Sequence, residues 1–325
     1  MLSKIKNTIL LSHTDLDGES CIILAQNYFK NLVSKRISYN TILQTLQEIV
    51  AEVGASNEKL QLLMTDLKMS EEDFKYLQEN HQYFSNIVII DHHLYDFEIP
   101  NILNAEVYIN TNYCAAALTY KYLSKEIDLS AYKRFVKLVN TYDLWQYNSI
   151  DFDEAKTLNR LYWHMGARTF NRRFFFTPKI TDNMRLKAQE LLDEIEKYFK
   201  DCESKGALFY TPEVTVALCD KHIGELKEFY DSKVIINLRN LYHYSIRFSD
   251  TMSDETAEKL RDLILSQVSD DICISKGGHL KAFGITMQEM SLERAKQETE
   301  KFAKVVSEFL NTVNFIKDDY NDKIF

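Results

Sequence analysis

The sequence predicts an α/β fold, with an amino-terminal parallel sheet and a smaller carboxy-terminal α/β domain that has a mixed sheet. Three apolar runs in the first half each end in aspartate or histidine and are separated by segments with helical apolar spacing. This alternation is typical of a parallel sheet with crossover helices. A chain of 325 residues is also long for one hydrophobic core, which favours two domains.

The first half contains the clearest predicted elements. We expect strands at 8–11, 37–39, 61–65, 87–90 and 106–109, and helices at 19–32, 41–53, 71–82, 113–124 and 131–142. Ser70 and Asp73 resemble a capping box at the start of the third helix, with Asp in place of Glu. Gly54 is interpreted as the residue that ends the second helix.

A long helix at 182–205, rich in Leu, Glu and Lys and followed by Gly206, is predicted to connect the two domains. Beyond it we expect strands at 214–218, 233–238, 242–248 and 282–287, and helices at 223–230, 254–265 and 291–313. The strands at 233–238 and 242–248 are expected to pair as a hairpin. The predicted organisation is therefore a catalytic domain at 1–180, a connector helix at 181–206 and a substrate-binding domain at 207–325.

The composition narrows the classes of function. Its 45% hydrophobic and 27% charged residues are ordinary for a soluble globular protein. The formal net charge of -9 disfavours stable binding of duplex nucleic acid, but it allows a small anionic substrate held by bound metals. No apolar run approaches the ~20 residues of a membrane span. The five scattered cysteines are expected to be free thiols, which favours a cytoplasmic location.

The first apolar run leads directly into His13, Asp15 and Asp17. On an extended backbone, side chains two residues apart share a face, so these three would converge at the end of a buried strand. Carboxylates are rarely buried unless they are paired or bound to metal. The stretch therefore predicts a divalent-metal site, and Gly18 allows the backbone to turn before the next helix.

Two later strands end in the same kinds of residue. Asp66 follows the run at 61–65, and Asp91-His92-His93 follows the run at 87–90. In parallel α/β sheets ligands bind outside the carboxyl ends of the strands, so these side chains are expected to meet at one edge. Asp143, at the end of a predicted helix, is a candidate for the last ligand; capping of the next turn is the alternative.

Two features of the second half indicate a phosphate site. Ser245 and Arg247 share one face of a predicted strand, and arginine is suited to bidentate contact with phosphate. Lys276-Gly277-Gly278-His279 is interpreted as a glycine turn whose backbone amides form an anion-binding nest. A plain turn would also explain the glycines.

The segments His13–Gly18, Asp66, Asp91–His93 and Asp143 resemble, in order and spacing, the four motifs of the DHH phosphoesterase family. The stretches at 245–247 and 276–284 resemble its associated carboxy-terminal substrate domain, of the DHHA1 type. Lys276 replaces the first glycine of the usual Gly-Gly-Gly-His turn and adds a positive charge near the expected phosphate, so we expect a substrate preference that differs from that of relatives. The family includes RecJ-type single-strand exonucleases, nanoRNases, cyclic-dinucleotide phosphodiesterases and, more distantly, family II inorganic pyrophosphatases.

The resemblance implies two divalent ions, Mn²⁺ first, with Mg²⁺, Co²⁺ or Fe²⁺ as alternatives. One ion would be held by His13, Asp15 and Asp66, and the other by Asp17, Asp66, His92 and Asp143. His93 would face the scissile phosphate as a catalytic residue, and Asp91 would orient the histidines. The far end of the substrate would be held by Ser245, Arg247, Lys276, Gly277, Gly278 and His279.

These expectations favour a phosphodiesterase that hydrolyses short single-stranded oligonucleotides or dinucleotides to mononucleotides. The alternatives are a 3′-phosphoadenosine 5′-phosphate phosphatase, a RecJ-like single-strand exonuclease and a non-catalytic nucleotide-binding regulatory protein. Because no ligand of the motifs is missing, the non-catalytic alternative is disfavoured. The spacing of the first motif disfavours a pyrophosphatase. The sequence does not distinguish an RNA from a DNA substrate or a linear from a cyclic dinucleotide. It also leaves the oligomeric state open, with a homodimer as one option.

Overall fold

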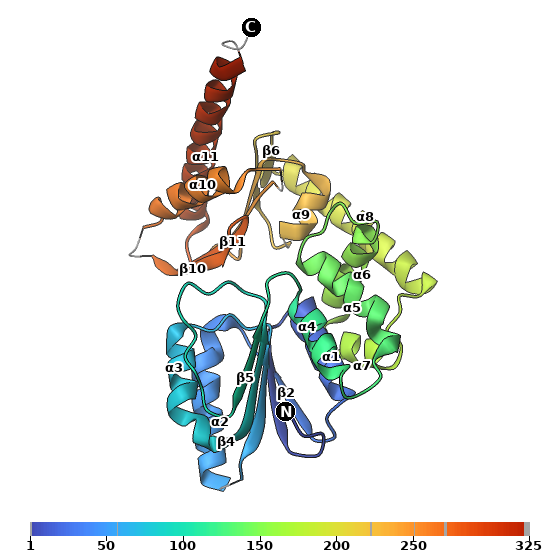
Figure 1. Cartoon of the computed structure of the whole chain (residues 1–325). Coiled ribbons are helices and arrows are strands. Elements are labelled where there is room, and N and C mark those ends of the chain that lie inside the picture. The colour runs from blue at the N-terminus through green and yellow to red at the C-terminus, as the bar shows by residue number, and fades with distance from the viewer. Residues whose placement is uncertain (1, 57, 222, 250, 270–271, 322–325) are drawn as a thin grey trace. The chain divides into compact units, whose positions relative to one another are not determined.

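The chain divides into two compact units, Met1–Gln189 and Glu190–Phe325. The computed structural model describes residues 2–56, 58–221, 223–249, 251–269 and 272–321 (Figure 1), with only the backbone described at 223, 277–279 and 313–321. No helix in these ranges combines the length and the apolar character needed to cross a lipid bilayer.

The first unit is built on a five-stranded parallel sheet with the order β2-β1-β3-β4-β5. Its strands are β1 (Thr8–Ser12), β2 (Leu32–Arg36), β3 (Leu60–Thr65), β4 (Phe84–Asp91) and β5 (Ala105–Ile109). Because β2 lies on one side of β1 and β3 on the other, the strand order reverses between β1 and β3. Ligands of open α/β sheets bind at such a reversal, outside the carboxyl ends of the strands.

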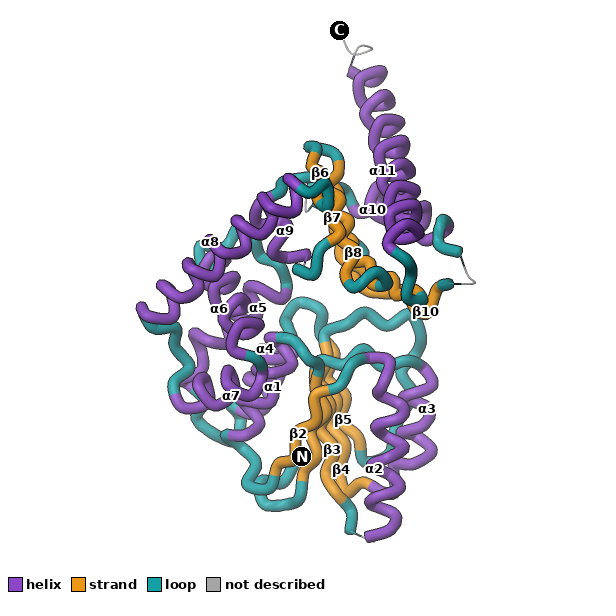
Figure 2. The backbone as a smooth tube through the Cα atoms, turned by 180° about the vertical axis from the view of Figure 1, so that it is seen from behind, coloured by secondary structure: helices purple, strands orange, loops and turns teal. Residues whose placement is uncertain are grey.

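Helices cover both faces of this sheet (Figure 2). They are α1 (Leu16–Gln26), α2 (Ile42–Ser56), α3 (Glu71–Asn80), α4 (Ala115–Leu123), α5 (Lys133–Asp143), α6 (Phe152–Met165) and α7 (Ala167–Phe176), with 3-10 turns η1 (Tyr39–Thr41), η2 (His81–Tyr83) and η3 (Ser130–Tyr132). Leu10 of β1 packs into the core formed with α1, α4, α5, α6 and α7. Its neighbours Ile9 and Leu11 pack into the core formed with α2 and α3. Burial on both faces explains the continuous apolar runs.

Several predicted boundaries in the first unit were wrong. The strand expected at 37–39 is β2 (Leu32–Arg36), and the helix expected to reach residue 32 ends at Gln26. As an edge strand with mostly half-buried side chains, β2 lacks the apolar pattern that marked the central strands. Gly54 lies inside α2 rather than after it, and α6 was not predicted. The capping box of Ser70 and Asp73 is confirmed.

The second unit contains a mixed six-stranded sheet with the order β10-β11-β9-β8-β7-β6. Its strands are β6 (Leu208–Tyr210), β7 (Val214–Leu218), β8 (Val234–Arg239), β9 (His243–Phe248), β10 (Cys273–His279) and β11 (Ala282–Met287), and its helices are α9 (Ile223–Phe229), α10 (Asp254–Ser266) and α11 (Leu292–Asn321). Strands β7 and β8 are parallel, whereas β8 and β9 form the predicted antiparallel pair. The predicted fold class, a parallel first sheet and a mixed second sheet, is confirmed.

Helix α8 (Asp182–Ser204) has nearly the limits predicted for the connector. Its Met184 belongs to a core of the first unit, and its Phe199 belongs to a core of the second. The boundary between the units falls within this helix, after Gln189. The division of labour between a catalytic and a substrate-binding domain stays a prediction.

The segment 276–279 does not form the predicted glycine turn. It lies in β10, where Lys276 pairs with Ile285 and Gly277 with Gly284 of the antiparallel β11. The predicted glycine turn is therefore wrong, because these residues extend along a strand, and their part in phosphate binding stays a prediction.

Candidate metal centre

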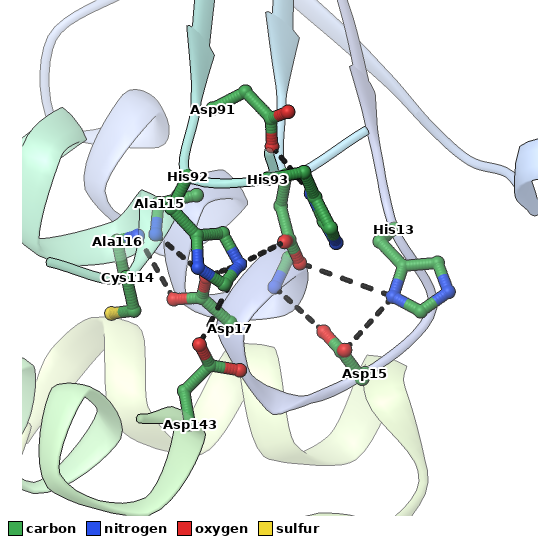
Figure 3. Close-up of polar contacts among 12 residues, drawn as sticks. His13, Asp15, Asp17, Asp91, His92, His93, Cys114, Ala115, Ala116 and Asp143 are labelled. Atoms are coloured by element: carbon green, nitrogen blue, oxygen red, sulfur yellow. Dashed lines mark hydrogen bonds and ion pairs between the residues drawn. The ribbon is translucent and has the colours of Figure 1, made fainter. Parts of the chain in front are cut away.

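The residues of the predicted metal site gather at the carboxyl ends of β1, β3 and β4. The described part of the chain contains three groups whose ligand atoms lie within 4.8 Å of one another. They are His13, Asp15 and Asp66; Asp17, His92 and Asp143; and Asp66, Asp91, His92 and His93. All six side chains proposed as metal ligands therefore lie together, at the edge that the strand order singles out. Most of them are seen in Figure 3.

Asp66 lies between two imidazoles. Its Oδ2 is 3.9 Å from Nδ1 of His13, and its Oδ1 is 3.3 Å from Nε2 of His92. Its φ of 57° is unusual for a residue other than glycine, and its amide donates to the carbonyl oxygen of Ile90 at 3.1 Å. Such backbone strain persists where the surroundings fix it, often at functional sites. Each oxygen of Asp66 thus points to a different group of candidate ligands.

The turn between β1 and α1 sets the first group. Oδ2 of Asp15 is 2.8 Å from Nδ1 of His13, and its Oδ1 accepts the amide hydrogen of Gly18 at 2.9 Å. Asp15 therefore caps α1. A Cβ atom on Gly18 would lie 2.3 Å from the carbonyl oxygen of His13. The close return of the chain onto His13 thus requires glycine at this position.

The amino terminus of α4 holds Asp17, a member of the second group. Both oxygens of Asp17 accept backbone hydrogen bonds, from Ala115 at 2.7 Å and from Ala116 at 2.9 Å (Figure 3). Nε2 of His92 lies 3.9 Å from Asp17 and 3.6 Å from Asp143. A helix amino terminus stabilises negative charge, so α4 keeps Asp17 in place from a segment almost one hundred residues away in sequence.

The carboxylates of the centre repel one another. Burial and the charges of Asp15 and Asp17 raise the pKa of Asp66 well above its usual value. Burial and the same two charges raise the pKa of Asp143 well above its usual value. Burial would also raise the pKa of Asp15, but the hydrogen bond and charge of His13 outweigh it and lower that pKa. Burial lowers the pKa of His92, which favours the neutral ring that a metal ligand requires.

These residues fit divalent cations. Among the described atoms, Oδ2 of Asp66 and Oδ2 of Asp143 are buried without a hydrogen-bond donor. Buried polar atoms normally have partners, and clustered carboxylates need positive charge nearby. Carboxylate and imidazole ligands suit Mn²⁺ and related ions. The group can therefore bind metal; the number of ions and their identity stay proposals.

Asp91 orients His93. One oxygen of Asp91 is 2.8 Å from Nδ1 of His93, and the other accepts the hydroxyl hydrogen of Tyr95 at 2.6 Å. Although burial acts to raise the pKa of Asp91, the hydrogen bond and charge of His93 outweigh it, and that pKa is lowered. An ionised Asp91 fixes the proton on Nδ1 of His93 and turns Nε2 toward the site.

Tyr39 belongs to this site and was not predicted. Its ring stacks on His13, and its hydroxyl is 3.3 Å from Nε2 of His93. We expected Tyr39 in a strand at 37–39. No role at the site was predicted for it, because an aromatic residue in a polar segment belongs to no recognisable motif. Its one signal was its position just after the strand that neighbours β1.

The predicted substrate residues belong to the second unit. Strand pairing places Ser245 opposite Gly284, which in turn pairs with Gly277. Arg247 lies opposite Ala282. Arg247 is half-buried and Lys276 is exposed, whereas the side chain of His279 lies outside the described residues. The predicted substrate residues therefore lie on β9 and β10, the two strands on either side of β11, and their role stays a prediction.

Comparison with protein-family models gives no match. The chain is 26% identical over 202 residues to a 3′,5′-cyclic-nucleotide phosphodiesterase of Helicobacter pylori, covering 58% of this chain and 56% of that protein. It is 29% identical over 210 residues to oligoribonuclease NrnB of Bacillus subtilis, covering 59% of this chain and 51% of that protein. The chain thus matches little more than half the length of these curated relatives.

Solved structures share the fold. The DHH domain of a member of the S1p family of ribosomal proteins has a TM-score of 0.60 and 15% identity, covering 93% of this chain and 86% of that one. Exonuclease RecJ bound to manganese has a TM-score of 0.55 and 12% identity, covering 92% and 90%. The chain therefore shares its fold with these two solved structures, and its sequence is similar to the two curated relatives over little more than half of their length.

Proposed function

We propose that the protein is a metal-dependent phosphodiesterase that hydrolyses short single-stranded oligonucleotides or dinucleotides to mononucleotides. The observation that carries this proposal is the position of Asp66, whose two oxygens face His13 and His92 at 3.9 and 3.3 Å. A carboxylate shared between two groups of ligands suits a pair of divalent ions, and such pairs serve phosphoester hydrolysis. The curated relatives named as a nucleotide phosphodiesterase and an oligoribonuclease support the same reaction class.

In this proposal the ligands divide into two sets that share one carboxylate. The first set is His13, Asp15 and Asp66, and the second is Asp17, Asp66, His92 and Asp143. Divalent ions at such a site supply positive charge that polarises the phosphate and lowers the pKa of a bound water. Mn²⁺ is the proposed ion, supported by the ligand types and by the manganese bound to a RecJ structure of the same fold.

The chain's own residues orient the groups that would meet the phosphate. His93 is the proposed catalytic residue, because Asp91 fixes its Nδ1 and directs Nε2 into the site. There Nε2 can stabilise charge on the phosphate or give a proton to the leaving oxygen. Ser245, Arg247, Lys276, Gly277, Gly278 and His279 are proposed to hold the far end of the substrate, with Arg247 as the main phosphate contact.

The test is a substrate panel with purified protein and Mn²⁺. It contains labelled RNA and DNA of two to five nucleotides, longer single strands, linear and cyclic dinucleotides, 3′-phosphoadenosine 5′-phosphate and pyrophosphate. We expect the highest kcat/KM on the linear two- to five-mers. Preference for strands longer than about ten nucleotides would instead indicate a RecJ-like exonuclease, and preference for the bisphosphate would indicate a phosphatase.

The Asp66→Ala variant tests the shared carboxylate. We expect it to lose at least about a hundredfold in kcat/KM, because both groups of ligands lose a member. Asp73→Ala, which removes a carboxylate that caps α3, is the control for loss of stability without loss of a ligand. Hydrolysis that survives Asp66→Ala would reject the two-ion proposal.

A further inference from the structure

Tyr39 contacts two histidines of the candidate metal centre. Its ring stacks on His13 with the centroids 4.4 Å apart and 10° between the planes. It meets the ring of His93 edge-on, with the centroids 5.5 Å apart. Its hydroxyl is 3.3 Å from Nε2 of His93. A side chain outside the four ligand motifs thus contacts a proposed metal ligand and the proposed catalytic residue.

Asp91 determines which nitrogen of His93 meets Tyr39. Because Asp91 is 2.8 Å from Nδ1 of His93, Nε2 is the nitrogen that faces the Tyr39 hydroxyl, at 3.3 Å. A tyrosine hydroxyl can both donate and accept a hydrogen bond, so Tyr39 can hold Nε2 with or without a proton. The hydroxyl and the ring of Tyr39 therefore act on different histidines.

Local hydrogen bonds hold Tyr39 in place. It begins the 3-10 turn η1, which is closed by the amide of Thr41 donating to the carbonyl oxygen of Ser38 at 3.0 Å. The hydroxyl of Thr45 in α2 donates to the carbonyl oxygen of Thr41 at 2.7 Å. The turn is thus tied to α2, and the ring is presented to the site from a fixed backbone.

We propose that Tyr39 is a positioning residue of the metal centre, which fixes the ring of His13 by stacking and the ring of His93 through its hydroxyl. Stacked rings restrict rotation about the side-chain torsions of His13, so less conformational entropy is lost when metal binds. The effect on His93 rests on the proposed function. The effect on His13 concerns metal binding alone and does not require it.

Two substitutions separate the two contacts. Tyr39→Phe keeps the ring and removes the hydroxyl, whereas Tyr39→Leu removes both. Tyr108 is the matched position in β5: it is 37% exposed, against 40% for Tyr39. Its hydroxyl donates to Glu106 at 2.8 Å, and its ring contacts Tyr122. Tyr108→Phe and Tyr108→Leu therefore remove the same kinds of contact away from the centre.

The first measurement is Mn²⁺ binding to the metal-free full-length chain by isothermal titration calorimetry, with thermal unfolding as the check on folding. We expect Tyr39→Leu to weaken Mn²⁺ binding about tenfold, as loss of an orienting partner does at metal sites. Tyr39→Phe and both Tyr108 variants are expected to bind Mn²⁺ within about twofold of the wild type. An unchanged affinity in Tyr39→Leu would overturn the role at His13.

The second measurement is steady-state hydrolysis of a linear dinucleotide at saturating Mn²⁺. We expect Tyr39→Phe to lower kcat about three- to tenfold and to leave KM within about twofold, because it alters only the orientation of His93. An unchanged kcat would overturn the role at His93. If the wild type hydrolyses no nucleotide, the proposed function fails, while the calorimetric result still decides the role at His13.

Discussion

The clustering of buried carboxylates disfavours the ionised form of Asp143. Its pKa is raised well above the usual value by burial and by the charges of Asp17 and Asp15. A carboxyl group whose pKa is raised on folding is more readily protonated in the folded state. Its contribution to stability is therefore fully present below its unfolded pKa and is lost as pH rises toward the folded value. Bound cations would reverse this loss.

We expect Asp143→Asn to stabilise the metal-free protein at neutral pH, by on the order of 1 kcal/mol or about 2–4 °C. The difference in melting temperature between variant and wild type should shrink as pH falls toward about 4, because the wild-type carboxyl becomes protonated. With excess Mn²⁺ the order should invert. Thermal unfolding at pH 4.5, 6 and 7.5, in chelator and in Mn²⁺, checks all three points. If the metal-free Asp143→Asn variant were less stable than the wild type at pH 7.5, the expected stabilisation would be contradicted.

A substitution in helix α4 can show whether backbone amides outside the first motif position Asp17. The amide of Ala115 donates to Asp17 at 2.7 Å, and Ala115 is the first residue of the helix, after Cys114. Proline is well tolerated at this position, and the ψ of 163° at Cys114 suits a residue before proline. Ala115→Pro therefore removes one hydrogen bond to Asp17 and leaves the helix intact.

We expect Ala115→Pro to fold normally and to bind Mn²⁺ about tenfold more weakly, because a hydrogen bond to a charged group contributes about 1.5–3 kcal/mol. Circular dichroism and calorimetry measure the two effects. Ala115→Gly keeps the amide and serves as the control for any change in helix propensity. Equal Mn²⁺ affinity in the proline variant and the wild type would show that α4 does not position Asp17.

The turn from β1 to α1 sets the first group of ligands, and substitution of Gly18 tests its importance. A Cβ atom at Gly18 would lie 2.3 Å from the carbonyl oxygen of His13 and 2.8 Å from its backbone nitrogen. Gly18→Ala must therefore displace backbone, and we expect a loss of about 2–4 kcal/mol in stability together with weaker Mn²⁺ binding. At Gly54, inside α2, the nearest atom would be 3.4 Å away in the Tyr83 side chain. Gly54→Ala should be neutral or stabilising, and chemical denaturation compares the two variants.

For the molecule as a whole, we propose that the first unit binds metal and that the second unit selects the substrate. We expect Arg247→Ala to lower kcat/KM on a linear dinucleotide by at least about tenfold. Activity on a small generic phosphodiester, which has no distal phosphate, should change by less than about twofold. Arg294→Ala, on the exposed surface of α11, is the control. Equal losses on both substrates would argue against substrate selection by Arg247.

The central features could be predicted from the sequence because they are local. Strands β1, β3 and β4 are buried on both faces, so each appears as an apolar run. Parallel strands present their carboxyl ends at one edge, so the residues that follow these runs were expected to meet. His13, Asp66 and His92 therefore lie together as predicted, without any knowledge of distances. The capping box at Ser70 was equally local.

Other features depend on contacts between distant segments, and only the tertiary structure reveals them. The extended path of 276–279 comes from pairing with β11, because glycine by itself permits either a turn or a strand. The donors to Asp17 are backbone amides of α4, and amides carry no sequence signature. Tyr39 reaches His13 and His93 from the 3-10 turn η1, which follows the edge strand β2. Local chemistry thus identifies the candidate ligands, whereas packing across the sheet determines what holds them in place.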